Sequence, residues 1–154
     1  MQAQPGYVKS LQILHNALLI GLLLFALIVI LLVKNGFAAT GNNFPADIFL
    51  YIAIAMSVIL VAMSYKLFNQ KLEEAKQENN LEDKLNGYRA AFILQLALCE
   101  APGLFAIICY FLTGNKMLLG LLFLLVVNFG SSHLTKSKLV QQLELDDEEA
   151  SMLD

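Results

Sequence analysis

The chain has little of what a water-soluble enzyme of its size needs. Only 15% of its 154 residues are charged, and it has two cysteines, two histidines and three prolines. Soluble domains carry about 25% charged residues. This shortage of charge, beside a large apolar fraction, excludes intrinsic disorder, nucleic-acid binding and an ordinary cytosolic enzyme.

The few cysteines and histidines also limit the chemistry. Cys99 and Cys109 are ten positions apart on one expected helix, about 15 Å, which is too far for a disulfide. His15 and His133 are far apart in the sequence, so no metal site is expected. The chain contains no HExxH, CxxC, GxSxG or glycine-rich phosphate loop. We therefore expect no enzyme activity, no cofactor and no metal.

Apolar residues make up 58% of the chain, with mean hydropathy +0.64. A membrane-spanning helix needs about 20 mostly apolar residues. Four stretches meet or approach that length: residues 11–33, 48–67, 90–112 and 117–134. The first is too long for the apolar core of a cleaved signal peptide, its main alternative. The sequence predicts an all-α polytopic membrane protein, with a four-helix transmembrane domain over residues 1–138 and an acidic tail over 139–154.

The basic residues predict the orientation. Two of them, Lys34 and Lys116, fall in the loops on one side of the four predicted spans. The others fall on the opposite side: Lys9, Lys66, Lys71, Lys76, Lys84, Arg89, Lys136 and Lys138. Cytoplasmic loops carry the excess of lysine and arginine. We expect a multi-pass protein of the cytoplasmic (inner) membrane, with both termini in the cytoplasm.

The polar segments are expected on the cytoplasmic side. Residues 69–88 alternate acidic and basic side chains at helical spacing, which predicts a helical hairpin broken near Asn79 and Asn80. This hairpin is either solvated or a docking surface for a soluble partner. The acidic tail is likewise a solvated end or an interaction segment.

The spans also suggest an internal repeat. A shift of 80 residues places Ile13 on Ile93 and Leu18 on Leu98, and it extends to the LFA triplets that begin at Leu24 and Leu104. Apolar helices match by chance often, so two tandem helical hairpins are one reading and an unrelated pair of hairpins is the other.

Polar residues inside the spans are the candidate functional groups, because they are costly in lipid. Helical rise places Glu100, Asn128 and Ser57 near the bilayer midplane, on three different helices. A second polar layer lies nearer the cytoplasm and contains His15, Asn16, Gln95, Ser64, Ser131, Ser132 and His133. Gln95 is positioned to hydrogen-bond to His15 across two helices.

Glu100 is the most informative of these residues. One reading is a protonated carboxyl that hydrogen-bonds to Asn128 or Ser57 and joins helices. Others are proton or cation handling, and binding of a ligand head group or partner. Pro102 lacks a backbone N–H and is expected to kink the helix beside the carboxyl, while Gly103 leaves the backbone accessible.

The segment Leu96 to Leu112, LALCEAPGLFAIICYFL, resembles the carboxylate helix of the proteolipid ring subunit (subunit c) of rotary ATP synthases. The resemblance rests on an EAxGLF-like pattern followed by apolar residues, and on a helix that leaves a polar cytoplasmic loop. It implies that Glu100 is an ion-binding carboxylate.

The sequence therefore leaves two functions open. The first is a small non-enzymatic membrane protein that acts as a subunit or accessory of a larger membrane complex. Its partners would be the lipid bilayer, other membrane subunits or a second copy, and no nucleic acid. The alternative is a proton- or cation-translocating protein that uses Glu100.

Overall fold

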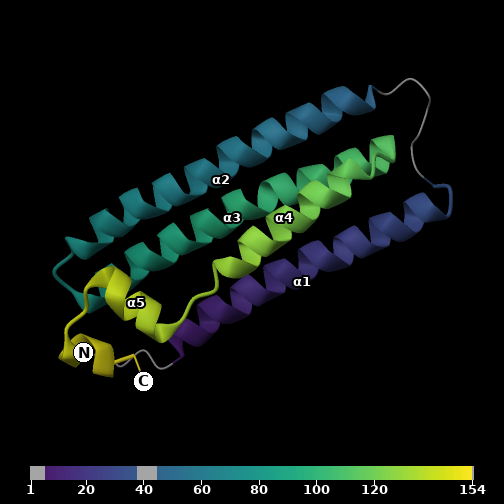
Figure 1. Ribbon diagram of the computed structural model, residues 1–154. Coiled ribbons are helices and arrows are strands. Elements are labelled where there is room, and N and C mark those ends of the chain that lie inside the picture. The colour runs from purple at the N-terminus through teal and green to yellow at the C-terminus, as the bar shows by residue number, and fades with distance from the viewer. Residues whose placement is uncertain (1–5, 38–44, 154) are drawn as a thin grey trace.

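The computed structural model describes residues 6–37 and 45–153, and these ranges are helical with no strand. The six helices are α1 (Tyr7–Lys34), α2 (Ala46–Lys76), α3 (Leu81–Thr113), α4 (Met117–Ser131), α5 (Lys136–Leu143) and α6 (Asp147–Ser151). α1 to α4 lie lengthwise beside one another, and α5 and α6 gather at one end (Figure 1). The all-α prediction is confirmed for the described residues.

Three of the helices are long and apolar enough to cross a membrane. α1, α2 and α3 contain 28, 31 and 33 residues, which correspond to about 40–50 Å of helix against about 30 Å of hydrocarbon. α2 and α3 continue beyond their apolar parts and meet in a turn at residues 77–80. The chain therefore has the helices of a membrane protein.

The fourth predicted span differs from the structure. α4 ends at Ser131 after 15 residues, about 22 Å of helix, and α5 follows at an angle of 75°. α4 therefore covers most of the predicted fourth span, residues 117–134, and the chain bends before its end. By length and composition the described residues contain three candidate spans, or four if the bent pair α4–α5 counts as one.

Side chains explain why α4 stops. The hydroxyls of Ser131 and Ser132 donate to the Asn128 carbonyl oxygen at 2.6 and 3.5 Å, and such local bonds compete with helix continuation. Past the break, Gln12 of α1 donates to the Leu134 carbonyl at 2.8 Å. Thr135 is extended and its hydroxyl accepts from the Lys138 amide, which caps α5.

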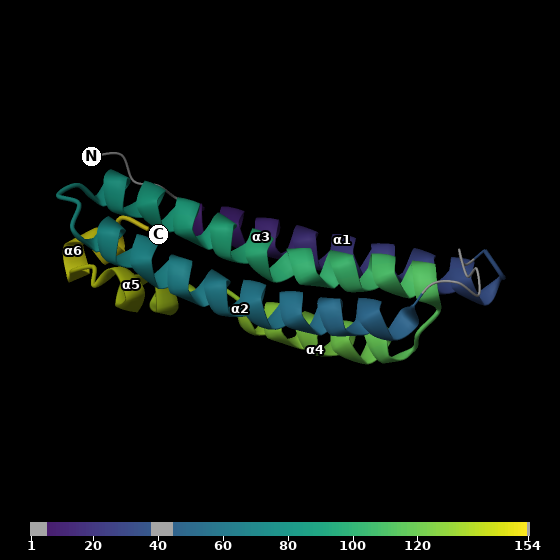
Figure 2. The ribbon, with the colours of Figure 1, turned by 90° about the horizontal axis from the view of Figure 1, so that it is seen from above.

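α3 is the centre of the bundle and packs against α1, α2 and α4. A Cβ atom at Gly87 would lie 2.8 Å from the Ala75 Cβ, so α2 and α3 approach closely there. Seen from above, α1 to α4 again lie lengthwise beside one another (Figure 2). The two predicted hairpins correspond to α1–α2 and α3–α4. α3 and α4 pack directly on each other, whereas α1 packs mainly on α3 rather than on α2. The two hairpins are therefore not packed alike.

The C-terminal segment folds back onto the bundle. Leu139, Leu143 and Leu153 are at most 5% exposed and belong to the same core as Leu85 and Tyr88 of α3. A capping box formed by Asp146 and Glu149 starts α6. The segment predicted as an acidic tail, either solvated or an interaction segment, is thus a packed module in the structure, because its leucines cover an apolar surface of the bundle.

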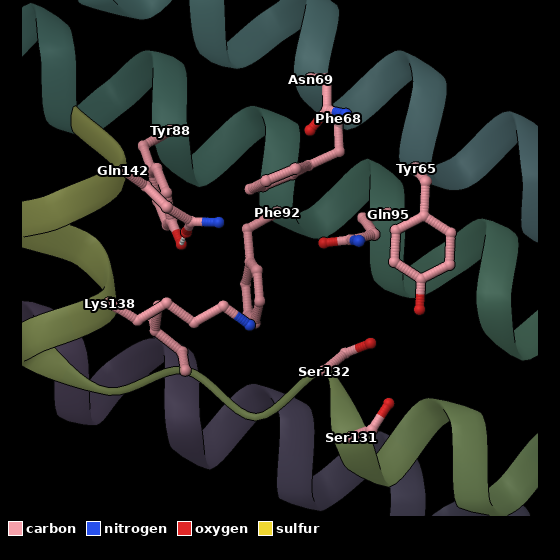
Figure 3. A pocket seen from close by; sticks show the side chains of 11 residues that line it. Tyr65, Phe68, Asn69, Tyr88, Phe92, Gln95, Ser131, Ser132, Lys138 and Gln142 are labelled. Atoms are coloured by element: carbon pink, nitrogen blue, oxygen red, sulfur yellow. Dashed lines mark hydrogen bonds between the residues drawn. The ribbon is translucent and has the colours of Figure 1, made fainter.

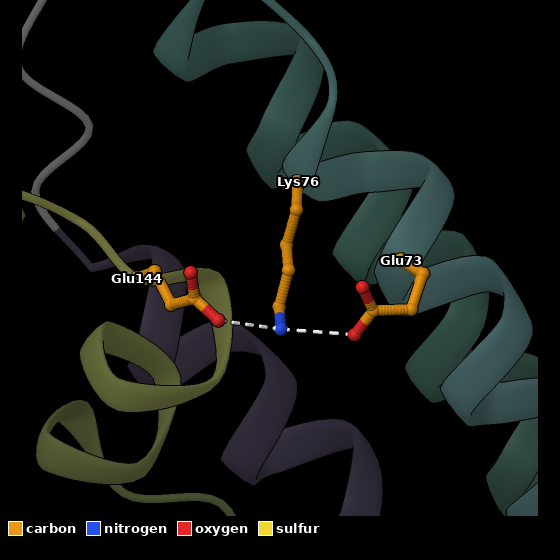
Figure 4. Close-up of polar contacts among 3 residues, drawn as sticks. All are labelled: Glu73, Lys76 and Glu144. Carbon is orange, nitrogen blue, oxygen red and sulfur yellow. Dashed lines mark hydrogen bonds and ion pairs between the residues drawn. The ribbon is translucent and has the colours of Figure 1, made fainter.

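Ion pairs hold this module to the α2–α3 turn. Lys84 of α3 contacts Glu149 at 2.8 Å, and both side chains are largely buried. Lys76 at the end of α2 lies between Glu144 at 2.8 Å and Glu73 at 2.9 Å (Figure 4). The Lys76 ammonium lowers the pKa of the Glu144 carboxyl from its ordinary value.

Candidate functional site

The structure does not bring the three midplane residues together. The Ser57 hydroxyl donates to the Ala53 carbonyl of its own helix at 2.7 Å. The Asn128 amide donates to the Tyr65 hydroxyl of α2 at 3.3 Å. Glu100 is partly buried and makes no hydrogen bond or ion pair with any described residue. One of the readings of Glu100, a hydrogen bond to Asn128 or Ser57, is therefore not formed among the described residues.

The position of Glu100 on α3 explains this separation. Gly103, one helical turn further along, lies against the Leu22 side chain of α1, where an added Cβ would be 3.2 Å from a methyl group. Cys99, the residue before Glu100, lies on the α2 side, with its sulfur 3.2 Å from the Ser64 hydroxyl. Successive helical positions diverge by about 100°, so Glu100 lies away from the α2 side that carries Ser57.

Pro102 is buried inside α3, which continues as one helix from Leu81 to Thr113. Because Pro102 has no N–H, the Leu98 carbonyl lacks its usual helical donor. Two positions separate Leu98 from Glu100, which is about 200° around the helix, so this carbonyl and the Glu100 side chain lie on different faces of α3.

The two histidines are neighbours, contrary to the expectation from their sequence separation. Their ring centroids are 5.8 Å apart, and His15 stacks on Phe129 of α4 at 4.9 Å. His15 is buried with no hydrogen-bond partner for Nδ1 among the described residues. No group of three or more His, Cys, Asp or Glu side chains in these ranges could hold a metal ion. The bend after α4 returns His133 towards α1.

The rest of the second polar layer is divided between two environments. Asn16 is exposed on α1, and Ser64 is buried against Cys99. Gln95 does not bond to His15 and has no hydrogen bond to any described residue. It lines a cavity instead, together with Ser131 and Ser132.

This cavity has a volume of about 140 Å³ and lies between α2, α3 and the bend from α4 to α5 (Figure 3). Each of these parts of the chain contributes polar side chains to its wall. The lining side chains are Tyr65, Phe68, Asn69, Tyr88, Phe92, Gln95, Ser131, Ser132, Leu134, Lys138 and Gln142. Most of these residues were not predicted as a site from the sequence, because a straight fourth span would not bring residues 134–142 over α3.

A second, larger hollow of about 490 Å³ lies beside the α2–α3 turn. It is lined by Lys71, Glu74, Ala75, Glu78, Asp83, Gly87 and Ala90. Acidic side chains outnumber basic ones there, and most of the residues belong to the predicted cytoplasmic hairpin.

No family model, curated protein or solved structure is significantly similar to the chain.

Proposed function

We propose that the chain is a small non-enzymatic protein of the cytoplasmic membrane that acts as a subunit or accessory of a larger membrane assembly. Its partners are the bilayer and other membrane subunits or a second copy of this chain. A soluble partner with basic side chains would fit the acidic hollow beside the α2–α3 turn. The observation that carries the proposal is the unpaired Glu100 carboxyl.

The proposed topology has four spans, with both termini in the cytoplasm. The start of α1, the α2–α3 turn, α5 and α6 lie at the same end of the bundle (Figure 1). This end carries eight of the ten basic residues, which supports a cytoplasmic location under the positive-inside rule. In this topology the bent pair α4–α5 returns the chain to the cytoplasmic side.

A side chain of another subunit would supply the hydrogen bond or charge that the Glu100 carboxyl lacks within this chain's described residues. A carboxyl near the membrane midplane is costly unless a hydrogen-bond donor or cation reaches it. No described residue of this chain supplies one, and α1 carries a stripe of apolar side chains at least half exposed, including Ile20, Leu24 and Leu31. A polar side chain on another subunit's helix can pair with Glu100 while its apolar surface covers part of this stripe.

The test compares Glu100→Gln with Glu100→Leu in complexes extracted in mild detergent. Gln keeps a hydrogen-bonding group, so the mass of the complex should stay that of the wild type. Leu removes it, and association should weaken by about 0.6–2 kcal/mol, as for other intramembrane polar contacts.

The matched control is Ile93→Leu, at an exposed apolar position two turns earlier on α3. It keeps the volume and the apolar character of the side chain, so the complex should keep its wild-type mass. The proposal would be refuted if the Glu100→Leu protein were extracted in a complex of wild-type mass, or if the wild type itself were a monomer.

The second candidate function is proton or cation translocation through Glu100. The specific observation in its favour is Glu100 itself, a carboxyl inside an apolar helix that makes no hydrogen bond or ion pair with a described residue. Intramembrane carboxyls mark proton and ion pathways in many membrane proteins. The resemblance to the proteolipid helix points in the same direction.

Translocation is tested in proteoliposomes. Dicyclohexylcarbodiimide should label Glu100, and Glu100→Gln should abolish ion flux because the amide cannot cycle its charge. Glu82→Gln, at the α2–α3 turn, is the matched control and should keep wild-type flux. Normal flux through Glu100→Gln would eliminate this candidate without affecting the subunit proposal.

A further inference from the structure

The cavity between α2, α3 and the α4–α5 bend contains a buried polar group without a partner. Gln95 is 6% exposed and lines the cavity, and its amide has no hydrogen bond within the described residues. Figure 3 shows it in the middle of the lining side chains. The amide atoms are accessible through the cavity, so a ligand bound there can hydrogen-bond to them.

The charge of the cavity is positive. Lys138 is the one charged side chain among the described residues that line it, and no carboxylate of the described ranges pairs with its ammonium. Lys76 and Lys84, nearby at the same end of the bundle, are both engaged in ion pairs. The ammonium of Lys138 is therefore available to an anion.

Hydrogen-bond donors surround this charge. The Asn69 amide has no partner among the described residues. The Gln142 oxygen accepts from the Tyr88 hydroxyl at 2.8 Å, which leaves the Gln142 NH₂ group as a donor. The Tyr65 hydroxyl accepts from Asn128, so its own proton is available. One ammonium with several neutral donors is suited to the oxygens of a phosphate.

The volume and the surroundings favour a phosphate that belongs to a lipid. About 140 Å³ holds a group the size of about four waters. Gln95 lies five positions after the start of the predicted third span, about 7 Å deep, at head-group level. Two apolar side chains deeper in the membrane, Leu124 and Val58, are each 66% exposed. Leu124 lies one turn before Asn128, and Val58 lies two turns before Tyr65. Acyl chains can cover these side chains.

We propose that this cavity binds the phosphate of an anionic phospholipid, with Lys138 as the counter-charge and the Gln95 and Asn69 amides as donors. Among the described residues, no acidic side chain lines the cavity to pair with the ammonium of a zwitterionic head group. The site therefore prefers phosphatidylglycerol to phosphatidylcholine. It depends on a membrane location, as proposed above, but not on the pairing of Glu100.

The test adds phosphatidylglycerol, phosphatidylcholine or inorganic phosphate to delipidated full-length protein. Lipid retention is measured by native mass spectrometry, and the melting temperature is measured in parallel. Phosphatidylglycerol should be retained and should raise the melting temperature more than phosphatidylcholine. Lys138→Met should lower its affinity about tenfold, the equivalent of one charge-assisted hydrogen bond, while the melting temperature without lipid stays unchanged. Lys138→Arg should restore binding.

Lys66→Met, an exposed lysine on α2 that does not line the cavity, is the matched control and should bind as the wild type does. Equal retention of the two lipids, or wild-type binding by Lys138→Met, would overturn the proposal. A rise in melting temperature with inorganic phosphate as large as that with phosphatidylglycerol would also overturn it, because the site would then take free anions.

Discussion

The effect of a single residue in this bundle depends on the atoms that surround its side chain. Gly87 leaves room for the Ala75 methyl group at the tightest approach of α2 and α3. Glu100 and Gln95 are polar groups without partners among the described residues, and they differ in their surroundings. Gln95 faces a polar cavity, whereas Glu100 lies beside the α1–α3 contact, so the two require different kinds of ligand.

Gly87→Ala should destabilise the protein. Its Cβ would lie 2.8 Å from the Ala75 Cβ and 3.3 Å from the Ala75 Cα, so the helices must separate, at a cost of about 1–3 kcal/mol. Thermal unfolding in mild detergent measures the effect. Gly120→Ala is the control, because nothing lies within 4 Å of its added Cβ, and it should gain about 0.5–1 kcal/mol. Equal melting temperatures for the two variants would contradict the close approach.

At the scale of elements, the C-terminal module closes one end of the bundle. Its leucines bury apolar surface against the bundle, and its ion pairs join it to the α2–α3 turn. The pairs differ in exposure: the side chains of Lys84 and Glu149 are 16% and 21% exposed, whereas those of Lys71 and Glu74 are 49% and 67% exposed. Water screens the second pair much more than the first.

A double-mutant cycle should reveal this difference. Lys84→Met with Glu149→Gln should show a coupling of about 1 kcal/mol, at the upper end for partly exposed pairs. Gln at position 149 retains the capping box, so the cycle reports the charge. Amide exchange in α6 measures the opening of the module. The same cycle on Lys71 and Glu74 should give at most about 0.5 kcal/mol. Equal couplings would show that burial does not strengthen the Lys84–Glu149 pair.

The module should also loosen in acid. Lys76 lowers the pKa of Glu144 below its ordinary value of 4.5, so the folded state favours the charged form. The stabilisation is fully present above that ordinary value, and it is lost as the pH falls through the lowered pKa. Protection factors for residues 145–151 should fall over that range in the wild type. Glu144→Gln should have lower protection at neutral pH and a weaker pH dependence; an unchanged profile would show that the contact contributes nothing.

The elements that could be predicted from sequence are those set by local composition. The long apolar runs predicted α1, α2 and α3. The break predicted near Asn79 and Asn80, within the segment of alternating acidic and basic side chains, agrees with the turn at residues 77–80. The early end of α4 was not predicted: the serines at 131 and 132 are its local cause, but the bond from Gln12 of α1 to the Leu134 carbonyl, past the break, depends on the tertiary fold. The cavity and the His15–His133 contact depend on that bend, so they were missed as well.

At the scale of the whole molecule, most charged side chains of the described residues lie at one end. The α2–α3 turn and α6 are joined through Lys84 and Glu149, and the α3–α4 turn lies at the opposite end (Figure 1). The proposed topology therefore rests on two separate observations. Packing requires the α2–α3 turn and α6 to be on the same side of the membrane, while the basic residues predict that this side is the cytoplasm.

Cysteine labelling in intact cells tests both arguments. Asn79→Cys and Ser151→Cys should react with a membrane-impermeant maleimide only after permeabilisation, whereas Lys116→Cys should react from outside. The wild type is the control and should stay unlabelled, because Cys99 and Cys109 are at most 3% exposed. Labelling of residues 79 and 151 from outside, without residue 116, would reverse the proposed orientation but keep the packing. Labelling of residue 151 from outside while residue 79 stays protected would contradict the packing itself, since the Lys84–Glu149 contact cannot form across a bilayer of about 30 Å.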